Sequence, residues 1–325
     1  MKRLLKTTIG ALALGLCATA AVAEYPERPI GMIIPYGPGG ATDISARTIA
    51  DALGKAVGNP LVMSNKVGAG GATGSVAVKN AKPDGYTMLF ARVGSHTVNP
   101  AMKATLPYTL EDFTFVGVYE INPVACAVGM DSGINTIDDL IAKVKAGGTT
   151  YSSSGVGSLL HIAAAFVLSE FGIEDPAKAS THIPLKGGGE AATAVLTGTA
   201  TFICTNTSAL APFVANKQLK PLLVTTATPV VGFDAPTSKD LGKPGLEKLV
   251  GWTGIAGPAG LPADIAKKWE GWLAEAITDE KFKKTMEAAG SVIDLMDPVT
   301  SKAFIQDQYE VFRRLVDQLG MRIEG

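Results

Sequence analysis

Short apolar runs alternate with amphipathic segments along most of this 325-residue chain, and each kind of pattern predicts a different element. The apolar run at 29–36 predicts a first strand. The segment after it places Ile49 and Leu53 on one helical face and meets a stop signal at Gly58. Further elements are expected at 61–65 (strand), 75–80 (helix) and 86–93 (strand). This alternation predicts an α/β fold with mainly parallel sheets.

The same alternation continues after residue 123. Thr136, followed by two aspartates, starts a helix that should end at Gly147. The other helices are expected at 158–171, 190–196, 262–289 and 301–319, and the strands at 124–128, 149–153, 181–185, 201–205 and 222–225.

The chain is long for a single core, so we expect two lobes. The first lobe would comprise residues 24–122 and a return segment at 223–325, and the second would comprise residues 123–222. Two crossings, near 120–124 and 220–226, would then act as a hinge beside a cleft.

Small-residue turns follow several of the predicted strands, at 35–43, 68–74, 152–158 and 186–189. Such turns let backbone N–H groups converge, and a helix that starts there adds partial positive charge, so they suit an anion without a cationic side chain. One glycine turn alone is an ordinary connection. Four of them at strand ends, where ligands bind in open parallel sheets, favour a binding site.

Several side chains beside these turns have two interpretations each. Asp43 either caps its helix, the interpretation we favour, or contacts a ligand ammonium group. His96 and His161 either donate to a ligand or hold their loops. Arg92 and Lys186 either meet a second acidic group of the ligand or are solvated surface charges. Tyr36 is the aromatic residue expected to pack over a ligand.

The first 23 residues predict an export signal. They carry early basic residues and an apolar run, and they end in the small-x-small sequence Ala21-Val22-Ala23, so we expect cleavage before Glu24. Lipidation at Cys17 is disfavoured by the leucine before it. No later stretch is long and apolar enough for a membrane span, which predicts a soluble exported protein. Cys126 and Cys204 could pair there, but their apolar contexts favour buried free thiols.

Catalytic and cofactor motifs are not apparent in the sequence. No complete dinucleotide fingerprint, Walker loop or Gly-x-Ser-x-Gly elbow is present, so no cofactor is expected. The three histidines are far apart in sequence, which gives a metal site no support. A net charge of −1 without a basic stripe argues against nucleic acid. An exported enzyme acting on an organic acid, with Asp43, His96 or His161 as base, stays an alternative, as does a ligand-loaded sensor subunit.

The motifs taken together resemble the Bug family of solute receptors for tripartite tricarboxylate transporters. The resemblance rests on 25–30 (YPERPI), 35–43 (PYGPGGATD), 68–71 (GAGG), 83–87 (PDGYT), 96–100 (HTVNP), 151–158 (YSSSGVGS), 184–188 (PLKGG), 251–252 (GW) and 258–262 (PAGLP). It spans nearly the whole chain in the right order. Two residues depart from the family: Arg92 stands where small or hydroxyl residues are common, and Leu185 replaces a frequent tyrosine. The resemblance therefore does not indicate which chemical group the far end of the ligand carries.

The resemblance implies a two-lobed type II periplasmic binding protein, without enzymatic activity, that closes over a small carboxylate and delivers it to a membrane permease. We expect a monomer. Carried over, the family's loops and their neighbours nominate a set of ligand-binding residues: Tyr36, Pro38, Gly39, Gly40, Ala41, Thr42, Asp43, Gly70, Gly71, Arg92, Ser95, His96, Ser153, Ser154, Gly155, Val156, Gly157, Ser158, His161, Lys186, Gly187 and Gly188.

Overall fold

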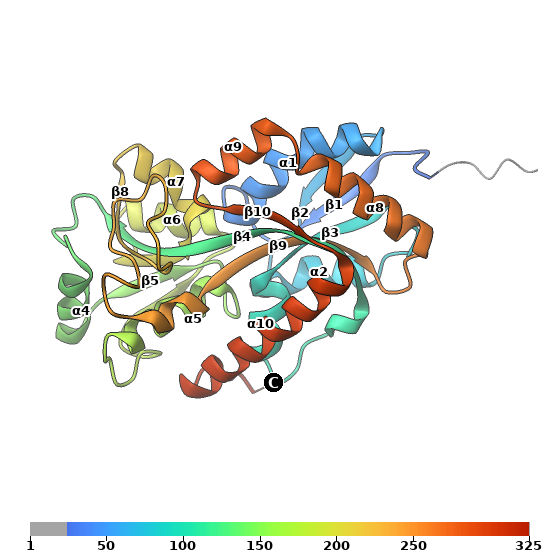
Figure 1. The fold of residues 1–325 in the computed structure, drawn as a ribbon. Helices are drawn as coiled ribbons and strands as arrows, with labels where there is room; N and C mark the ends of the chain where they lie inside the picture. The colour runs from blue at the N-terminus through green and yellow to red at the C-terminus, as the bar shows by residue number, and fades with distance from the viewer. Residues whose placement is uncertain (1–24, 325) are drawn as a thin grey trace, which may run out of the picture.

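Two long antiparallel strands form the centre of the computed structural model, which describes residues 25–324. Strands β4 (Phe113–Gly129) and β9 (Val250–Pro258) cross the middle of the molecule, with β1, β2 and β3 at one end and β5 and β8 at the other (Figure 1). The strand order is β2-β1-β3-β9-β4-β7-β5-β6, and β8 and β10 also pair with β4. The predicted export signal at 1–23 lies outside the described residues.

The sheet is mixed, which corrects the expectation of mainly parallel sheets. The outer strands are parallel: β1 (Ile30–Ile34), β2 (Leu61–Asn65) and β3 (Thr87–Arg92) at one end, and β5 (Thr150–Ser153), β6 (Thr181–Pro184) and β7 (Phe202–Asn206) at the other. Antiparallel pairs join them through β4, β9, β8 (Leu219–Val224) and β10 (Val292–Met296). Antiparallel pairing arises because β4 and β9 carry the chain back and forth between the two outer groups.

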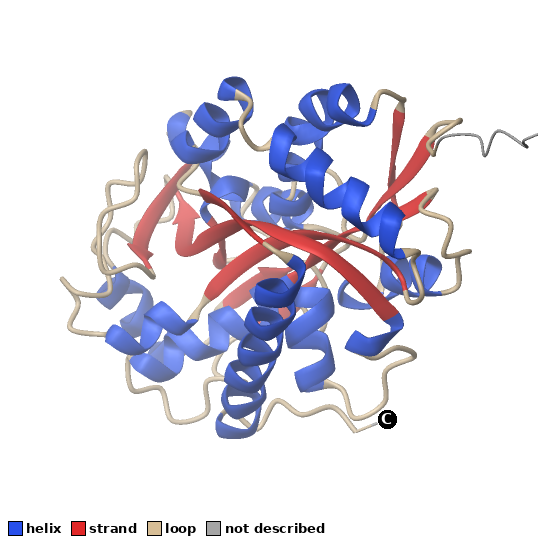
Figure 2. Cartoon of the chain, turned by 45° about the vertical axis from the view of Figure 1, so that its right-hand side comes forward, coloured by secondary structure: helices blue, strands red, loops and turns tan. Residues whose placement is uncertain are grey.

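Helices cover both faces of the sheet (Figure 2). They are α1 (Ala41–Val57), α2 (Ala72–Lys79), α3 (Asn99–Met102), α4 (Ile137–Ala146), α5 (Leu159–Glu170), α6 (Gly188–Leu196), α7 (Thr207–Ala215), α8 (Ala263–Ala276), α9 (Glu280–Ala288) and α10 (Pro298–Gln318). Within residues 25–324, none of them has the length and apolar character needed to cross a membrane.

Local signals fixed several element boundaries as predicted. Helix α1 ends at Gly58, which has a left-handed φ of 73° and donates its N–H to carbonyls of the last turn. Helix α4 begins with a capping box in which Thr136 and Asp139 bond each other's backbone N–H. Strand β2 has the predicted limits. The sequence therefore places these boundaries well.

One further expectation was wrong, and another was incomplete. The long helix at 262–289 is two helices, because Asp279 accepts a hydrogen bond from the Phe282 N–H (2.8 Å) and starts α9. The strand expected at 124–128 is present as the second half of β4. Its first half was missed because it contains the charged Glu120 and so lacks a continuous apolar run. Helix α7, which has Pro212 inside it, and strand β10 were not predicted.

The long strand β4 changes its partner along its length. Residues up to Pro123 pair with β9, and residues from Val124 onward pair with β7. Trp252 on β9 is fully buried within one apolar cluster, while a second cluster packs α1, α8 and α9 around Trp269. The partner change falls at the predicted boundary between the lobes, and the lobe limits themselves remain a prediction.

Cys126 and Cys204 form a disulfide, so the preference for free thiols was wrong. The two residues are direct partners in the antiparallel β4–β7 ladder, with their Cα atoms 4.0 Å apart. Apolar flanking residues indicated burial correctly, but they do not reveal that two buried strands lie side by side.

Candidate functional site

The ends of five strands converge on one small cavity of about 30 Å³. Its walls come from the loops after β1, β3, β5, β6 and β7 and from the first turns of the helices that follow. The lining residues are Tyr36, Gly40, Ala41, Thr42, Arg92, Val93, Gly94, Ser154, Leu159, Leu160, Gly188, Thr205 and Asn206. The predicted small-residue loops therefore meet, although they are far apart in the sequence.

Three helices point uncapped N-termini at this cavity. The residues before α1, α6 and α7 are Gly40, Gly187 and Asn206, and none of their side chains accepts a hydrogen bond from the helix. The first N–H groups of a helix have no partner within it. In α4, α9 and α10, by contrast, a threonine or aspartate caps the start. These helix starts thus offer free backbone donors and partial positive charge to the cavity, beside the side chain of Arg92.

The loop after β1 and the loop after β6 touch each other backbone to backbone. Gly37 donates its N–H to the carbonyl of Lys186 (3.1 Å). A Cβ atom at Gly40 would lie 3.0 Å from the amide nitrogen of Gly188, and one at Gly187 would lie 2.7 Å from the Cα of Gly37. These glycines therefore do more than expose N–H groups, because they allow the two loops to close over the cavity.

A second pair of loops meets in the same way beside the cavity. A Cβ atom at Gly70 would lie 2.5 Å from the carbonyl oxygen of Val156, and one at Gly155 would lie 3.3 Å from the amide nitrogen of Gly70. Tyr36, which is buried and lines the cavity, donates its hydroxyl to the carbonyl of Gly70 (2.8 Å). Burial raises the pKa of Tyr36, so this hydroxyl keeps its proton.

Arg92 lies inside the protein at the edge of the cavity, so the surface-charge interpretation of this residue was wrong. Its side chain is 4% exposed and donates to Asn206 Oδ1 (2.6 Å) and to the hydroxyl of Thr253. Thr253 in turn donates to Glu120 Oε2 (2.6 Å), and Arg92 Nη1 lies 3.6 Å from the same oxygen. Burial lowers the pKa of Arg92, and the charge of Glu120 opposes that shift.

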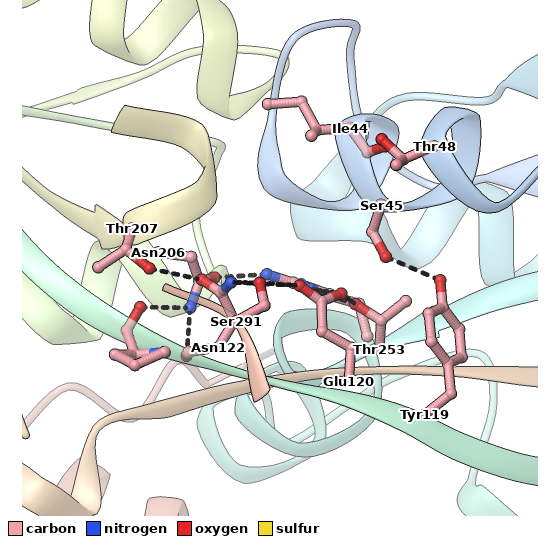
Figure 3. Close-up of polar contacts among 12 residues, drawn as sticks. Ile44, Ser45, Thr48, Tyr119, Glu120, Asn122, Asn206, Thr207, Thr253 and Ser291 are labelled. Atoms are coloured by element: carbon pink, nitrogen blue, oxygen red, sulfur yellow. Dashed lines mark hydrogen bonds and ion pairs between the residues drawn. The ribbon is translucent and has the colours of Figure 1, made fainter. Parts of the chain in front are cut away.

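The network extends along β4 and fixes Asn206 (Figure 3). Glu120 Oε1 accepts hydrogen bonds from Ser291 (2.9 Å) and from Asn122 Nδ2 (3.2 Å). Asn206 donates to the carbonyl of Asn122 (2.9 Å). Every polar side chain in this row is buried, so the network is rigid and holds Arg92 and Asn206 in place at the cavity wall.

Asp43 is not among the residues that line the cavity. Its carboxylate accepts the Gly39 N–H (3.0 Å), the Asn65 amide (2.9 Å) and the Arg47 guanidinium (2.9 Å). These bonds hold the loop before α1. Asp43 lies in the first turn and Gly40 is the N-cap residue, so Asp43 does not cap the helix as the favoured interpretation had it.

His96 lies in an aromatic cluster behind the cavity and is fully buried. Its ring packs against Tyr108, Phe113 and Phe115, and its Nδ1 bonds the hydroxyl of Ser95 (2.9 Å). Burial lowers the pKa of His96 to about 3, so the ring is neutral at ordinary pH. The structure therefore places His96 and Ser95 in the core and not among the lining residues.

His161 stacks on His182, with 4.1 Å between the ring centroids, and Tyr151 continues the stack. His161 Nδ1 accepts a hydrogen bond from the Gly157 N–H (3.4 Å), which agrees with loop support. His182 Nε2 bonds the hydroxyl of Ser153 (2.5 Å). Burial, together with the charges of His182 and Lys103, lowers the pKa of His161 to about 3.

The remaining nominated residues surround the cavity without lining it. Pro38, Gly39, Val156 and Lys186 are exposed, whereas Gly71, Gly157 and Ser158 are buried. Ser158 caps α5. Sequence reasoning missed Val93, Gly94, Leu159, Leu160, Thr205 and Asn206. The predicted strand β7 could have pointed to Asn206, because its carboxyl end lies there. No glycine-rich turn follows that strand, so Asn206 was not nominated. Among residues 25–324, no three His, Cys, Asp or Glu side chains are placed to hold a metal ion.

Known proteins resemble this chain in sequence and in fold. Residues 45–321 match the model of the tripartite tricarboxylate transporter family receptor. The protein BugT of Bordetella pertussis is 28% identical over 315 residues, which cover 95% of each protein.

Solved structures share the fold. A periplasmic transporter superposes with a TM-score of 0.85 at 30% identity, covering 92% of this chain and 99% of that one. The periplasmic binding protein BugD superposes with a TM-score of 0.85 at 26% identity, covering 93% and 100%. MatC from Rhodopseudomonas palustris with bound malate shares the fold at 23% identity, with a TM-score of 0.83 and coverage of 90% and 100%. These neighbours confirm the predicted fold class, and the chain belongs to the tripartite tricarboxylate transporter receptor family, the Bug group of periplasmic solute-binding proteins.

Proposed function

We propose that this receptor binds a small carboxylate at the facing N-termini of α1 and α6 and delivers it to a membrane permease. The observation that supports the proposal is the pair of uncapped helix starts after Gly40 and Gly187, whose first residues, Ala41 and Gly188, line one cavity. Both helix ends carry partial positive charge, and the arginine that lines the cavity, Arg92, is paired with Glu120.

The expected strength of such binding is sufficient for a receptor. Four to six hydrogen bonds to a carboxylate, at roughly 1.5 to 3 kcal/mol each, give on the order of 6 to 18 kcal/mol. Association costs roughly 4 to 15 kcal/mol. A net value near −8 kcal/mol, about micromolar affinity, is therefore reachable with backbone donors.

We further propose that binding occurs without turnover. The three candidate bases are engaged elsewhere: His96 packs in the aromatic cluster, Asp43 bonds Gly39, Asn65 and Arg47, and His161 stacks on His182. The bound acid should then be recovered chemically intact, as mass spectrometry of the protein incubated with its ligand would show. A new product formed by the pure protein would contradict this and favour the exported enzyme.

We also propose that the two strand groups are lobes that close as a hinge around β4. The partner change between Pro123 and Val124 and the tight contact of Gly37 with Lys186 support this closure. The proposal includes a periplasmic monomer, cleaved before Glu24. The N-terminal sequence and the mass of protein recovered from the periplasm would check the cleavage and the oligomeric state.

The deciding experiment is a thermal-shift screen of the exported protein against mono-, di- and tricarboxylates and aromatic acids, followed by calorimetry on those that stabilise it. We expect at least one acid to raise the melting temperature in a concentration-dependent manner. Complete absence of stabilisation by every acid would contradict carboxylate binding. Malate, the ligand in one neighbour of the same fold, belongs in the first set.

A further inference from the structure

Arg92, Thr253 and Glu120 lie in one row across three neighbouring strands. Thr253 on β9 is the register partner of Arg92 on β3 and also of Glu120 on β4. The Thr253 hydroxyl accepts from Arg92 and donates to Glu120, so the guanidinium and the carboxylate face each other through one side chain. The sheet itself therefore fixes the position of the charge pair, and a ligand does not have to organise it.

Glu120 is fully buried and is not a lining residue of the cavity, whereas Arg92 is. The Glu120 carboxylate already accepts hydrogen bonds from Thr253, Ser291 and Asn122. Breaking a buried ion pair leaves an uncompensated charge, which is strongly unfavourable. A ligand is therefore not expected to pull Arg92 away from Glu120.

Arg92 keeps unused hydrogen-bonding capacity toward the cavity. A guanidinium has five N–H donors. The structure gives Arg92 two side-chain hydrogen bonds within residues 25–324, to Thr253 and Asn206. Asn206 and Thr205 line the same end of the cavity and add uncharged polar groups. This end can bond an oxygen of a ligand, while the charge of Arg92 is balanced by Glu120 behind it.

A second carboxylate at this end would meet both charges. Its attraction to Arg92 would be offset by repulsion from Glu120, since a like charge in a poorly solvated site disfavours the ionised form. A carbonyl, amide or hydroxyl oxygen would take the same hydrogen bonds without that repulsion. The free N–H groups of α7 are uncharged and bond such an oxygen equally well.

We propose that Glu120 determines the specificity of the receptor by neutralising Arg92, so that the preferred ligand is a monocarboxylate whose far end carries an uncharged hydrogen-bonding group. The inference rests on the proposed function, because it assumes that a carboxylate occupies the α1 and α6 helix starts.

The first test compares each dicarboxylate with its own monoamide by calorimetry on the wild-type protein: succinate with succinamate, glutarate with glutaramate, and adipate with adipamate. In the pair whose length fits the cavity, the monoamide should bind at least about tenfold more tightly. A dicarboxylate that binds as tightly as its monoamide, or more tightly, would overturn the inference and leave the proposed function intact. If no member of any pair binds, the proposed carboxylate function fails, and the inference fails with it.

The second test uses Glu120→Gln, which keeps the shape of the side chain and removes its charge. The affinity for the dicarboxylate relative to the monoamide should rise by at least about tenfold. Tyr119→Phe is the matched control, because it removes a buried hydrogen bond to Ser45 (2.8 Å) from the adjacent position of β4 without changing any charge (Figure 3). Tyr119→Phe should keep the wild-type ratio of dicarboxylate affinity to monoamide affinity. An unchanged ratio in folded Glu120→Gln would contradict the role of Glu120. If Glu120→Gln does not fold, the wild-type comparison decides alone.

Discussion

Cys126 and Cys204 are direct cross-strand partners, and their disulfide joins β4 to β7 inside the sheet, two residues before Asn206 reaches the cavity. The bond closes a loop with a sequence separation of 78 residues. Restriction of the unfolded chain by a loop of that length stabilises the protein by about 4 kcal/mol.

Replacement of both cysteines by alanine should therefore lower the free energy of unfolding by about that amount, measured by urea titration under oxidising conditions. In a strong reductant, the difference in the free energy of unfolding between the wild-type protein and the double variant should largely disappear. Equal stability of the two proteins under oxidising conditions would show that the disulfide does not form in solution.

Gly40→Val should weaken ligand binding by at least about tenfold, because the new side chain would be driven into the backbone at Gly188 and hold the loops after β1 and β6 apart. Gly54→Val is the matched control. It lies in the same helix, and a Cβ atom there would meet nothing within 4 Å. Calorimetry on both variants checks the prediction. Equal affinity in both would exclude a need for close contact between the two loops.

Local sequence patterns determine which residues of the site could be predicted. Gly40 and Gly188 were found because each lies in a glycine-rich turn directly after an apolar run, and Arg92 because it ends such a run. Asn206 lacks a turn signal of that kind. The pairing of Arg92 with Glu120 depends on the insertion of β9 between β3 and β4, and strand order is not written in a local pattern.

His96→Phe should make the protein less sensitive to acid. The pKa of His96 is about 3 in the folded protein, below the value of about 6.5 in an unfolded chain, so the unfolded state binds the proton first. The stability that neutral His96 contributes is complete above pH 6.5 and is lost as the pH falls toward 3, by up to about 1.4 kcal/mol per pH unit.

Urea unfolding of His96→Phe and of the wild type at pH 7 and pH 4.5 measures this effect. A phenylalanine fits the cluster with Tyr108, Phe113 and Phe115 and does not titrate. The wild type should lose more stability than the variant between the two pH values, whatever the carboxylates contribute to both. Parallel losses would mean that His96 takes up its proton in the folded state.

Gly251→Ala should disturb ligand binding through Asn206. A Cβ atom at Gly251 would lie 2.2 Å from Asn206 Nδ2, so the amide must leave its place between Arg92 and the carbonyl of Asn122. We expect a stability loss of about 1 to 3 kcal/mol from the broken buried hydrogen bonds. Affinity should fall as well, since Arg92 and Asn206 both line the cavity.

A double-mutant cycle separates this mechanism from a general disruption of β9. In an Asn206→Ala background the space beside Gly251 is empty, so adding Gly251→Ala should cost little further stability or affinity. Two substitutions that act through one contact are non-additive, whereas independent effects add within about 0.5 kcal/mol. Additive losses, measured by urea unfolding and calorimetry on the four proteins, would show that Gly251 acts on the strand and not on the position of Asn206.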